Sequence, residues 1–166
     1  MIYLDNAATA IKREEILKDI LENKEAFDGN PDSLHAKGRE AKKILEDSRK
    51  KIAKSIGANP KNVIFTSGAS EGNNTVINNF KDNEIITSAI EHDSILNTID
   101  KNNAILLDAN EDGIISLDDL KSKITDKTKL IAIMYVNNET GAIQPVKEIG
   151  AYLKDKDIRF HVDSVQ

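Results

Sequence analysis

The sequence predicts an α/β fold built around a mainly parallel sheet. Two amphipathic helical stretches open the chain, and short apolar runs then alternate with polar segments of helical length. Neighbouring parallel strands need a long crossover connection, which is usually a helix, so this alternation favours βαβ units. The sequence contains no internal repeat, low-complexity tract or linker. We therefore expect residues 1–166 to form one domain, with an arm and helices over about 1–57 and βα units over about 58–166.

The two opening helices are predicted by apolar residues that recur three and four positions apart. The two stripes consist of Ile16, Leu17, Ile20, Leu21 and Phe27, and then Ala41, Ile44, Leu45, Ile52, Ala53 and Ile56. Gly29 and Pro31 interrupt the helical pattern and indicate a loop between them. Gly57 stands where a helix cap is expected, and Pro60 follows shortly after it.

Five short apolar runs predict the strands of the sheet. They cover residues 63–65, 85–86, 104–107, 130–136 and 158–162, and candidate helices fill the gaps at about 70–81, 92–102, 117–124 and 145–156. Active sites of such sheets collect at the carboxyl ends of the strands. The last run ends near Gln166 with no helix after it to cover the sheet, so more protein is expected downstream.

Composition excludes several classes of function. A net charge of -5 and a pI near 5.3 argue against nucleic acid or an anionic membrane as partner. The first residues lack the basic and apolar regions of a signal peptide, and no run is long enough to span a bilayer. The absence of cysteine removes disulfides, thiolate metal sites and a thiol nucleophile from this stretch. A cytoplasmic location is expected.

The junction at residues 63–74 has the features of a phosphate site. It runs from an apolar strand through Ser67 and Gly68 into a helix, so free backbone N–H groups and the Ser70 hydroxyl would converge on one point. An ordinary serine N-cap is the alternative interpretation. The run matches neither the P-loop nor the dinucleotide fingerprint, which disfavours ATP and NAD.

Three further junctions carry groups suited to a flat heteroaromatic cofactor. Asp163 could hold a ring N–H, with Gln166 three positions beyond it and His161 in phase on the same strand. His92 could stack on a ring and move protons, and Asn138 could donate to a phenolic oxygen. Each residue also has a simpler interpretation, as a strand-end cap, a surface or cap histidine, and a turn asparagine.

Taken together, the residues at these junctions and several further strings along the chain resemble the first part of the cysteine desulfurases. These enzymes are members of the class V aminotransferase group with the fold-type I architecture. The resemblance extends over the whole chain. The matching strings are Tyr3-Leu-Asp-Asn-Ala-Ala-Thr9, Gly29-Asn-Pro-Asp-Ser-Leu-His35, Phe65-Thr-Ser-Gly-Ala-Ser-Glu71, Glu91-His92, Val136-Asn-Asn-Glu-Thr-Gly141 and His161-Val-Asp-Ser-Val-Gln166.

The resemblance implies a pyridoxal 5′-phosphate (PLP) cofactor in a partial fold-type I large domain. It also implies a role for each matched position. Ala69 and Ser70 would bind the phosphate, and His92 would stack on the ring as the catalytic proton shuttle. The remaining matches place Asp163 on the pyridine nitrogen, Asn138 and Gln166 near the ring hydroxyl, and Asn6, Ala7, Ala8 and Thr9 beside the substrate.

For the parent protein, the resemblance implies conversion of L-cysteine to L-alanine with sulfur transfer to a protein cysteine, as in iron–sulfur cluster assembly. It further implies a homodimer and a sulfur-acceptor or scaffold partner. The family's Schiff-base lysine and catalytic cysteine lie beyond the matched Gln166, so covalent PLP attachment and a complete reaction are not expected of these residues. The alternatives are a selenocysteine lyase, another class V lyase or aminotransferase, and a split or non-catalytic subunit.

Residues 108–119 also fit part of the calcium-loop pattern, with Asp119 in place of the final glutamate. An EF-hand loop needs a helix on both sides, whereas residues 104–107 are expected to be a strand. In the resembled family this window needs only Gly113 for a turn and Ser116 as an N-cap. No metal site is therefore expected, and a calcium module is the less favoured alternative.

Overall fold

The computed structural model describes residues 2–166, except for the side chain of Ala26, and divides them into two compact units. The first unit extends to Phe65, and the second runs from Thr66 to Gln166. Each unit has its own secondary-structure elements. None of the helices within residues 2–166 combines the length and apolar character that crossing a bilayer requires.

The first unit consists of helices and loops. Its elements are α1 (Glu14–Glu22), the 3₁₀ helix η1 (Lys24–Asp28), α2 (Ala36–Ser55) and the 3₁₀ helix η2 (Pro60–Asn62). The first predicted helix therefore ends earlier than its apolar stripe, which continues to Phe27 in η1. No residue of α1 is buried within the described chain.

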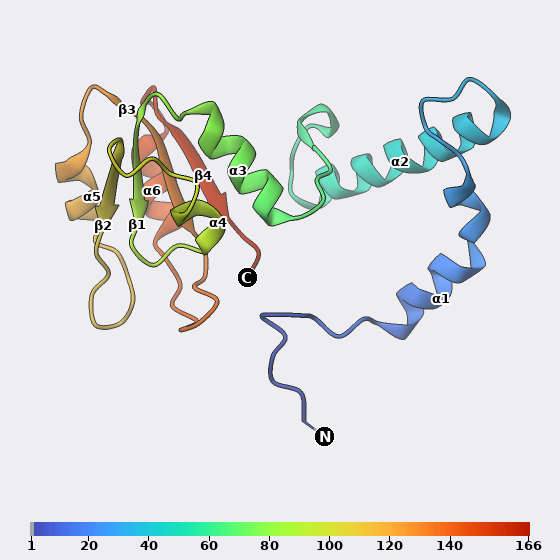
Figure 1. Ribbon diagram of the computed structural model, residues 1–166, viewed down its shortest axis with the longest axis horizontal. Helices are drawn as coiled ribbons and strands as arrows, with labels where there is room; N and C mark the ends of the chain where they lie inside the picture. The colour runs from blue at the N-terminus through green and yellow to red at the C-terminus, as the bar shows by residue number, and fades with distance from the viewer. Residues whose placement is uncertain (1) are drawn as a thin grey trace. The chain divides into compact units, whose positions relative to one another are not determined.

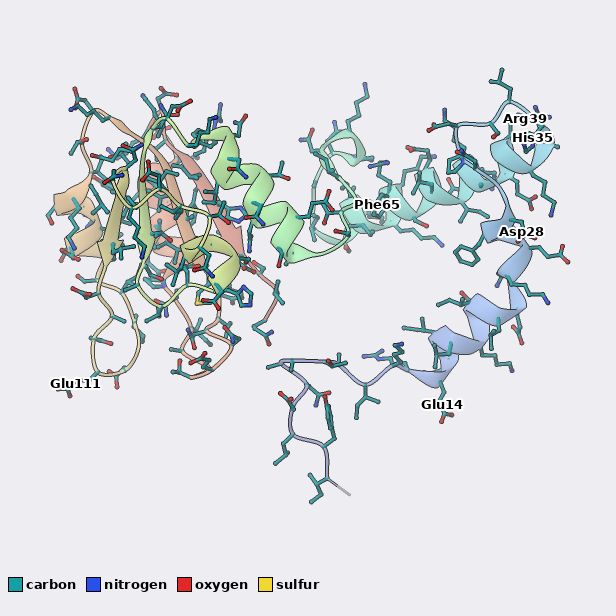
Figure 2. All side chains as sticks on the ribbon, viewed as in Figure 1. Glu14, Asp28, His35, Arg39, Phe65 and Glu111 are labelled. Atoms are coloured by element: carbon teal, nitrogen blue, oxygen red, sulfur yellow. The ribbon has the colours of Figure 1, made fainter. Side chains whose placement is uncertain are left out.

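Both ends of α2 are capped in ways that the sequence indicates. At its start, where Figure 2 labels His35, the ring atom Nδ1 of that residue accepts a hydrogen bond from the Gly38 N–H at 3.3 Å. At its end, Gly57 adopts a φ of 66°, and the Ala58 N–H reaches back to the Ala53 carbonyl at 2.8 Å. The predicted glycine cap is therefore confirmed.

The predicted strand at 63–65 is wrong, because this segment is extended without pairing to any strand in the described chain. Its interactions are with α2. The Arg49 guanidinium donates to the Val63 carbonyl and lies 4.9 Å from the centre of the Phe65 ring, beside α2 in Figure 2. Ile64 remains 80% exposed, so the apolar run reflects contacts with α2 rather than burial in a sheet.

The second unit is a four-stranded parallel sheet with helices on both faces, which confirms the predicted α/β fold with a parallel sheet. The strands β1 (Glu84–Ser88), β2 (Ala104–Leu107), β3 (Thr128–Met134) and β4 (Arg159–Asp163) are arranged in the order β2-β1-β3-β4. The helices are α3 (Ala69–Asn79), α4 (Asp93–Leu96), α5 (Leu117–Lys123) and α6 (Val146–Leu153). Figure 1 shows α3 and α4 on one side of the sheet and α5 and α6 on the other.

Alternation along the strands produces two separate cores. Leu130 and Ala132 pack on the side of α3 and α4, whereas Ile131 and Ile133 pack with residues of α5 and α6. Parallel register pairs Ala132 with His161 and Met134 with Asp163. His161 and Asp163 consequently point to the face that α3 covers.

The predicted helix at 92–102 is much shorter in the structure, where α4 has only four residues. A polar turn follows it. The Asp100 carboxylate accepts the Asn102 N–H at 2.9 Å, and the Asp100 carbonyl accepts the Asn103 N–H at 3.0 Å. These side-chain and turn hydrogen bonds compete with helical pairing, although Ile99 beyond α4 is still buried in the core.

Gly38, in the first turn of α2, packs closely against the loop that precedes this helix. A Cβ atom added at Gly38 would lie 2.2 Å from the Ser33 carbonyl oxygen, so backbone would have to move. We expect Gly38→Ala to destabilise the start of α2 by about 1–3 kcal/mol. Amide hydrogen exchange of residues 33–41 measures this change.

Gly72→Ala is the matched control, because a Cβ at Gly72 would meet nothing within 4 Å and alanine favours a helix. Unchanged exchange at residues 33–41 in Gly38→Ala would contradict the packing described for this loop.

Candidate functional site

The candidate site lies where the parallel strands end. Asp163 is the last residue of β4 and is only 9% exposed, so its carboxylate needs hydrogen bonds to remain in place. The Asn73 amide donates to Oδ2 at 2.8 Å, and the Val165 N–H donates to Oδ1 at 3.1 Å. Each oxygen of the carboxylate therefore has a donor from this chain.

Asn73 connects Asp163 to two histidines. It belongs to α3, is 3% exposed and uses both ends of its amide. Its Oδ1 lies 2.8 Å from His161 Nε2, and its Nδ2 also lies 2.9 Å from the Ser94 hydroxyl. The Ser94 hydroxyl is in turn 2.9 Å from His92 Nδ1. A continuous polar chain thus joins α3, β4 and the start of α4.

The start of α3 leaves backbone donors open. Its N-cap is Gly68, no side chain caps it, and the N–H groups of Ala69 and Ser70 make no hydrogen bond within the described chain. Glu71 instead accepts the Ser67 N–H at 2.6 Å and the Ser67 hydroxyl at 2.7 Å, and these bonds lower the pKa of the Glu71 carboxyl. A serine N-cap, the simpler interpretation of this junction, is therefore absent.

Ser70 is placed close to the polar chain by helical spacing. It precedes Asn73 by three residues, and side chains three apart share one side of a helix. The structure thus brings Asp163, His92 and the open end of α3 to one edge of the sheet. Their roles toward a cofactor remain predictions.

Asn138 lies in the exposed turn after β3, and its neighbour Asn137 holds that turn together. The Asn137 Oδ1 accepts the Thr140 N–H at 2.8 Å, and its amide donates to the Ile90 carbonyl at 3.0 Å. The side chain that links this turn to the loop after β1 is therefore Asn137. Asn138 and His92 both line a pocket of about 410 Å³ between the two loops.

Glu91 is a buried carboxyl, 5% exposed, among the residues that line this pocket. Its Oε1 accepts the Ser88 hydroxyl at 2.6 Å and the Met134 N–H at 2.9 Å. Burial raises the pKa of Glu91 to about 7; those two hydrogen bonds act in the opposite direction, and the charge of Asp163 adds to the rise. Burial lowers the pKa of His161, and the charge of Asp163 only partly offsets this lowering.

The other predicted site residues, Asn6 to Thr9 and Gln166, lie in exposed segments. Asn6 to Thr9 form an exposed turn of the first unit, in which the Thr9 N–H donates to the Asp5 carbonyl at 3.2 Å. Gln166 is exposed, three residues beyond the end of β4. The substrate-side and ring-hydroxyl roles of these residues remain predictions.

The calcium-like loop has strand β2 on its N-terminal side, as expected. Its Asn110 Oδ1 accepts the N–H groups of Asp112 and Ile114, at 3.0 and 2.9 Å, and Glu111 lies at the tip in Figure 2. Across residues 2–166, no group of three or more His, Cys, Asp and Glu side chains is arranged to hold a metal ion.

Sequence reasoning missed Asn73, Ser94 and Glu91. Asn73 and Ser94 appeared only as ordinary polar residues of predicted helices, and Glu91 only as part of a matching string. A polar residue on the core side of a helix is the available signal, since Asn73 precedes the buried Ile77 by four residues. Its partners lie far away in sequence and could not be named.

The raised pKa of Glu91 predicts how stability depends on pH. An acid whose pKa is higher in the folded protein loses stability as pH rises above its unfolded value, until the folded value is passed. We expect stability to fall between about pH 4.5 and pH 7 and then to level off. Glu91→Gln, which resembles the neutral acid, should remove this fall and exceed the wild type in stability above pH 7.

Urea unfolding at several pH values measures the difference between the two proteins. Glu111→Gln, at the exposed loop tip, is the control and should follow the wild type at every pH. Parallel curves for Glu91→Gln and the wild type would show that Glu91 ionises normally in the folded protein.

Known proteins resemble this chain in both sequence and structure. The family model described as Aminotransferase class-V matches residues 2–166. The chain is 39% identical over 176 residues to a protein named cysteine desulfurase IscS from Clostridium botulinum, covering 99% of this chain and 44% of that protein. The chain thus spans less than half the length of this curated relative.

Two solved structures share the fold over nearly the whole chain. One, described as a NIFS-like protein, has a TM-score of 0.91 and 34% identity, covering 99% of this chain and 49% of the other. A second, described as SspA in complex with cysteine, has a TM-score of 0.89 and 32% identity over 98% of this chain and 50% of the other. With the family-model match, these likenesses show that the chain belongs to the class-V aminotransferase family and corresponds to an N-terminal portion of cysteine desulfurase-like proteins.

Proposed function

We propose that this chain is the cofactor-holding portion of a PLP-dependent cysteine desulfurase. The observation that carries the proposal is the Asp163 carboxylate, fixed by Asn73 at the end of β4 and joined through Ser94 to His92. Parallel α/β sheets bind ligands at this edge. A carboxylate and an imidazole in one network suit a flat, nitrogen-containing ring.

The residues present fit the two ends of PLP. The open N–H groups of Ala69 and Ser70, with the Ser70 hydroxyl, would hold the phosphate at the positive end of α3. Asp163 would hold the pyridine nitrogen, and Asn138 and Gln166 would lie near the ring hydroxyl. When bound, PLP supplies an electron sink for bonds at the substrate α-carbon.

The protein's own groups would supply orientation and proton transfer. Asp163 would keep the ring nitrogen protonated, because a carboxylate beside it favours the charged form. His92 would cover one face of the ring and carry a proton to or from the reacting substrate. Asn6, Ala7, Ala8 and Thr9 would border the substrate.

L-Cysteine is the proposed substrate, with sulfur passing to a protein cysteine and L-alanine as product. The relatives' names and the cysteine complex of SspA support this choice. The family's Schiff-base lysine and catalytic cysteine are proposed to lie beyond the position matching Gln166, and residues 1–166 would contribute the non-covalent contacts to PLP. A homodimer and a sulfur-acceptor or scaffold partner are part of the same proposal.

PLP binding by the 166-residue chain tests the cofactor assignment. We expect calorimetry to show one site that inorganic phosphate weakens by competition. Ser70→Ala and Asp163→Asn should each reduce affinity by about 10–100-fold, the usual cost of losing one hydrogen bond to a charged group.

Asp118→Asn is the matched control, because Asp118 is exposed on α5 and pairs with Lys121. It removes one negative charge and should bind PLP like the wild type. Equal affinities for Asp163→Asn and Asp118→Asn would remove Asp163 from the cofactor site.

The activity itself is tested on a protein extended to the full length of its relatives. Incubation with L-cysteine and PLP should yield equal amounts of alanine and transferred sulfur, and His92→Gln should slow the reaction by about 10²–10⁴-fold. Alanine formation from selenocysteine alone would favour the selenocysteine lyase alternative.

A further inference from the structure

The positions of the protons in the polar chain around Asn73 follow from which of its atoms donate hydrogen bonds and which accept them. This polar chain of hydrogen-bonded side chains contains one carboxylate, one amide, one hydroxyl and two imidazoles. A carboxylate can only accept hydrogen bonds, and an amide nitrogen can only donate them. These two fixed roles set the direction of every other bond in the chain.

The direction of the Asn73 amide follows from Asp163. Because Oδ2 of Asp163 accepts, the NH₂ group of Asn73 must face it, and the Asn73 carbonyl oxygen then faces His161. That oxygen can only accept, so His161 must donate from Nε2 at 2.8 Å. His161 is therefore in the Nε2–H form, and the lowering of its pKa by burial agrees with a neutral ring.

The direction of Ser94 follows from Asn73. The second N–H of the Asn73 amide donates to the Ser94 hydroxyl oxygen, so the single hydroxyl proton of Ser94 is available for His92 Nδ1. The Ser94 backbone N–H also donates to this same nitrogen at 3.1 Å. Two donors aimed at Nδ1 require it to be unprotonated, which leaves the ring proton on Nε2.

We propose that Asn73 and Ser94 are positioning residues that fix the tautomers of His161 and His92, so that His92 offers its exchangeable proton at Nε2. Within the described chain, Nε2 of His92 has no hydrogen-bond partner, and the side chain is exposed at the pocket between the two loops. The proton of His92 therefore faces the pocket rather than the protein. Only the step that makes His92 a proton shuttle rests on the proposed function.

The Ser94–His92 and Asn73–His161 hydrogen bonds predict different responses to mutation. Ser94→Ala removes the hydroxyl donor to His92 while the backbone donor remains, so the Nε2–H to Nδ1–H ratio of His92 should fall about fivefold, the effect of one hydrogen bond. His161 should not change. Asn73→Ala removes the acceptor of His161 and should lower the same ratio for His161 by a similar factor.

Nitrogen-15 NMR of the imidazole rings measures both ratios in the chain without cofactor. The sequence has only three histidines, and His35, whose Nδ1 accepts the Gly38 N–H, is an internal reference that neither change should affect. Ser94→Thr keeps the hydroxyl and should restore the wild-type ratio of His92. This rescue separates positioning from general loosening of the fold.

A wild-type His92 mainly in the Nδ1–H form would overturn the proposal, as would equal ratios in Ser94→Ala and Ser94→Thr. A response of all three histidines to Ser94→Ala would also overturn it, because the effect would then be structural. Since no cofactor is present, failure to bind PLP leaves the result unaffected, and a negative NMR result leaves PLP binding unaffected.

Discussion

The buried carboxylate of Asp163 is the constraint around which the second unit is organised. A charged group this far from solvent costs several kcal/mol unless protein donors replace water. Its two donors come from different places, the Asn73 amide in α3 and the Val165 N–H just beyond β4. The need for the first donor ties the start of α3 to the end of β4, which is also where the open N–H groups of α3 lie.

A second carboxyl near the same strand ends shows how the chain limits charge there. Glu91 accepts a hydrogen bond from the Met134 N–H, and Met134 is the residue paired with Asp163 in the sheet. Charge on Asp163 disfavours a second anion at Glu91, and burial already favours the neutral form of Glu91. Burial therefore favours a protonated Glu91 near Asp163, the group whose two oxygens each have a donor.

Local patterns predicted the frame of the fold better than its polar interior. The strand at 104–107 has the predicted bounds, because its four apolar residues are bounded by polar turns. The segment at 63–65 is equally apolar, but a strand also needs a partner, and Arg49 holds it instead. Asn73 and Ser94 could not be predicted, since an asparagine in a helix becomes informative only when its partners, in this case far along the chain, are known.

The structural and chemical interpretations of His92 are linked. Sequence alone offered either a helix cap or a proton carrier, and the structure shows that the ring caps α4 through Nδ1. A cap accepts hydrogen bonds and so keeps protons away from that nitrogen. The capping interaction therefore determines which nitrogen remains to exchange protons at the pocket. A histidine held in this way has one orientation and one exchangeable position, which is the condition that acid–base chemistry places on it.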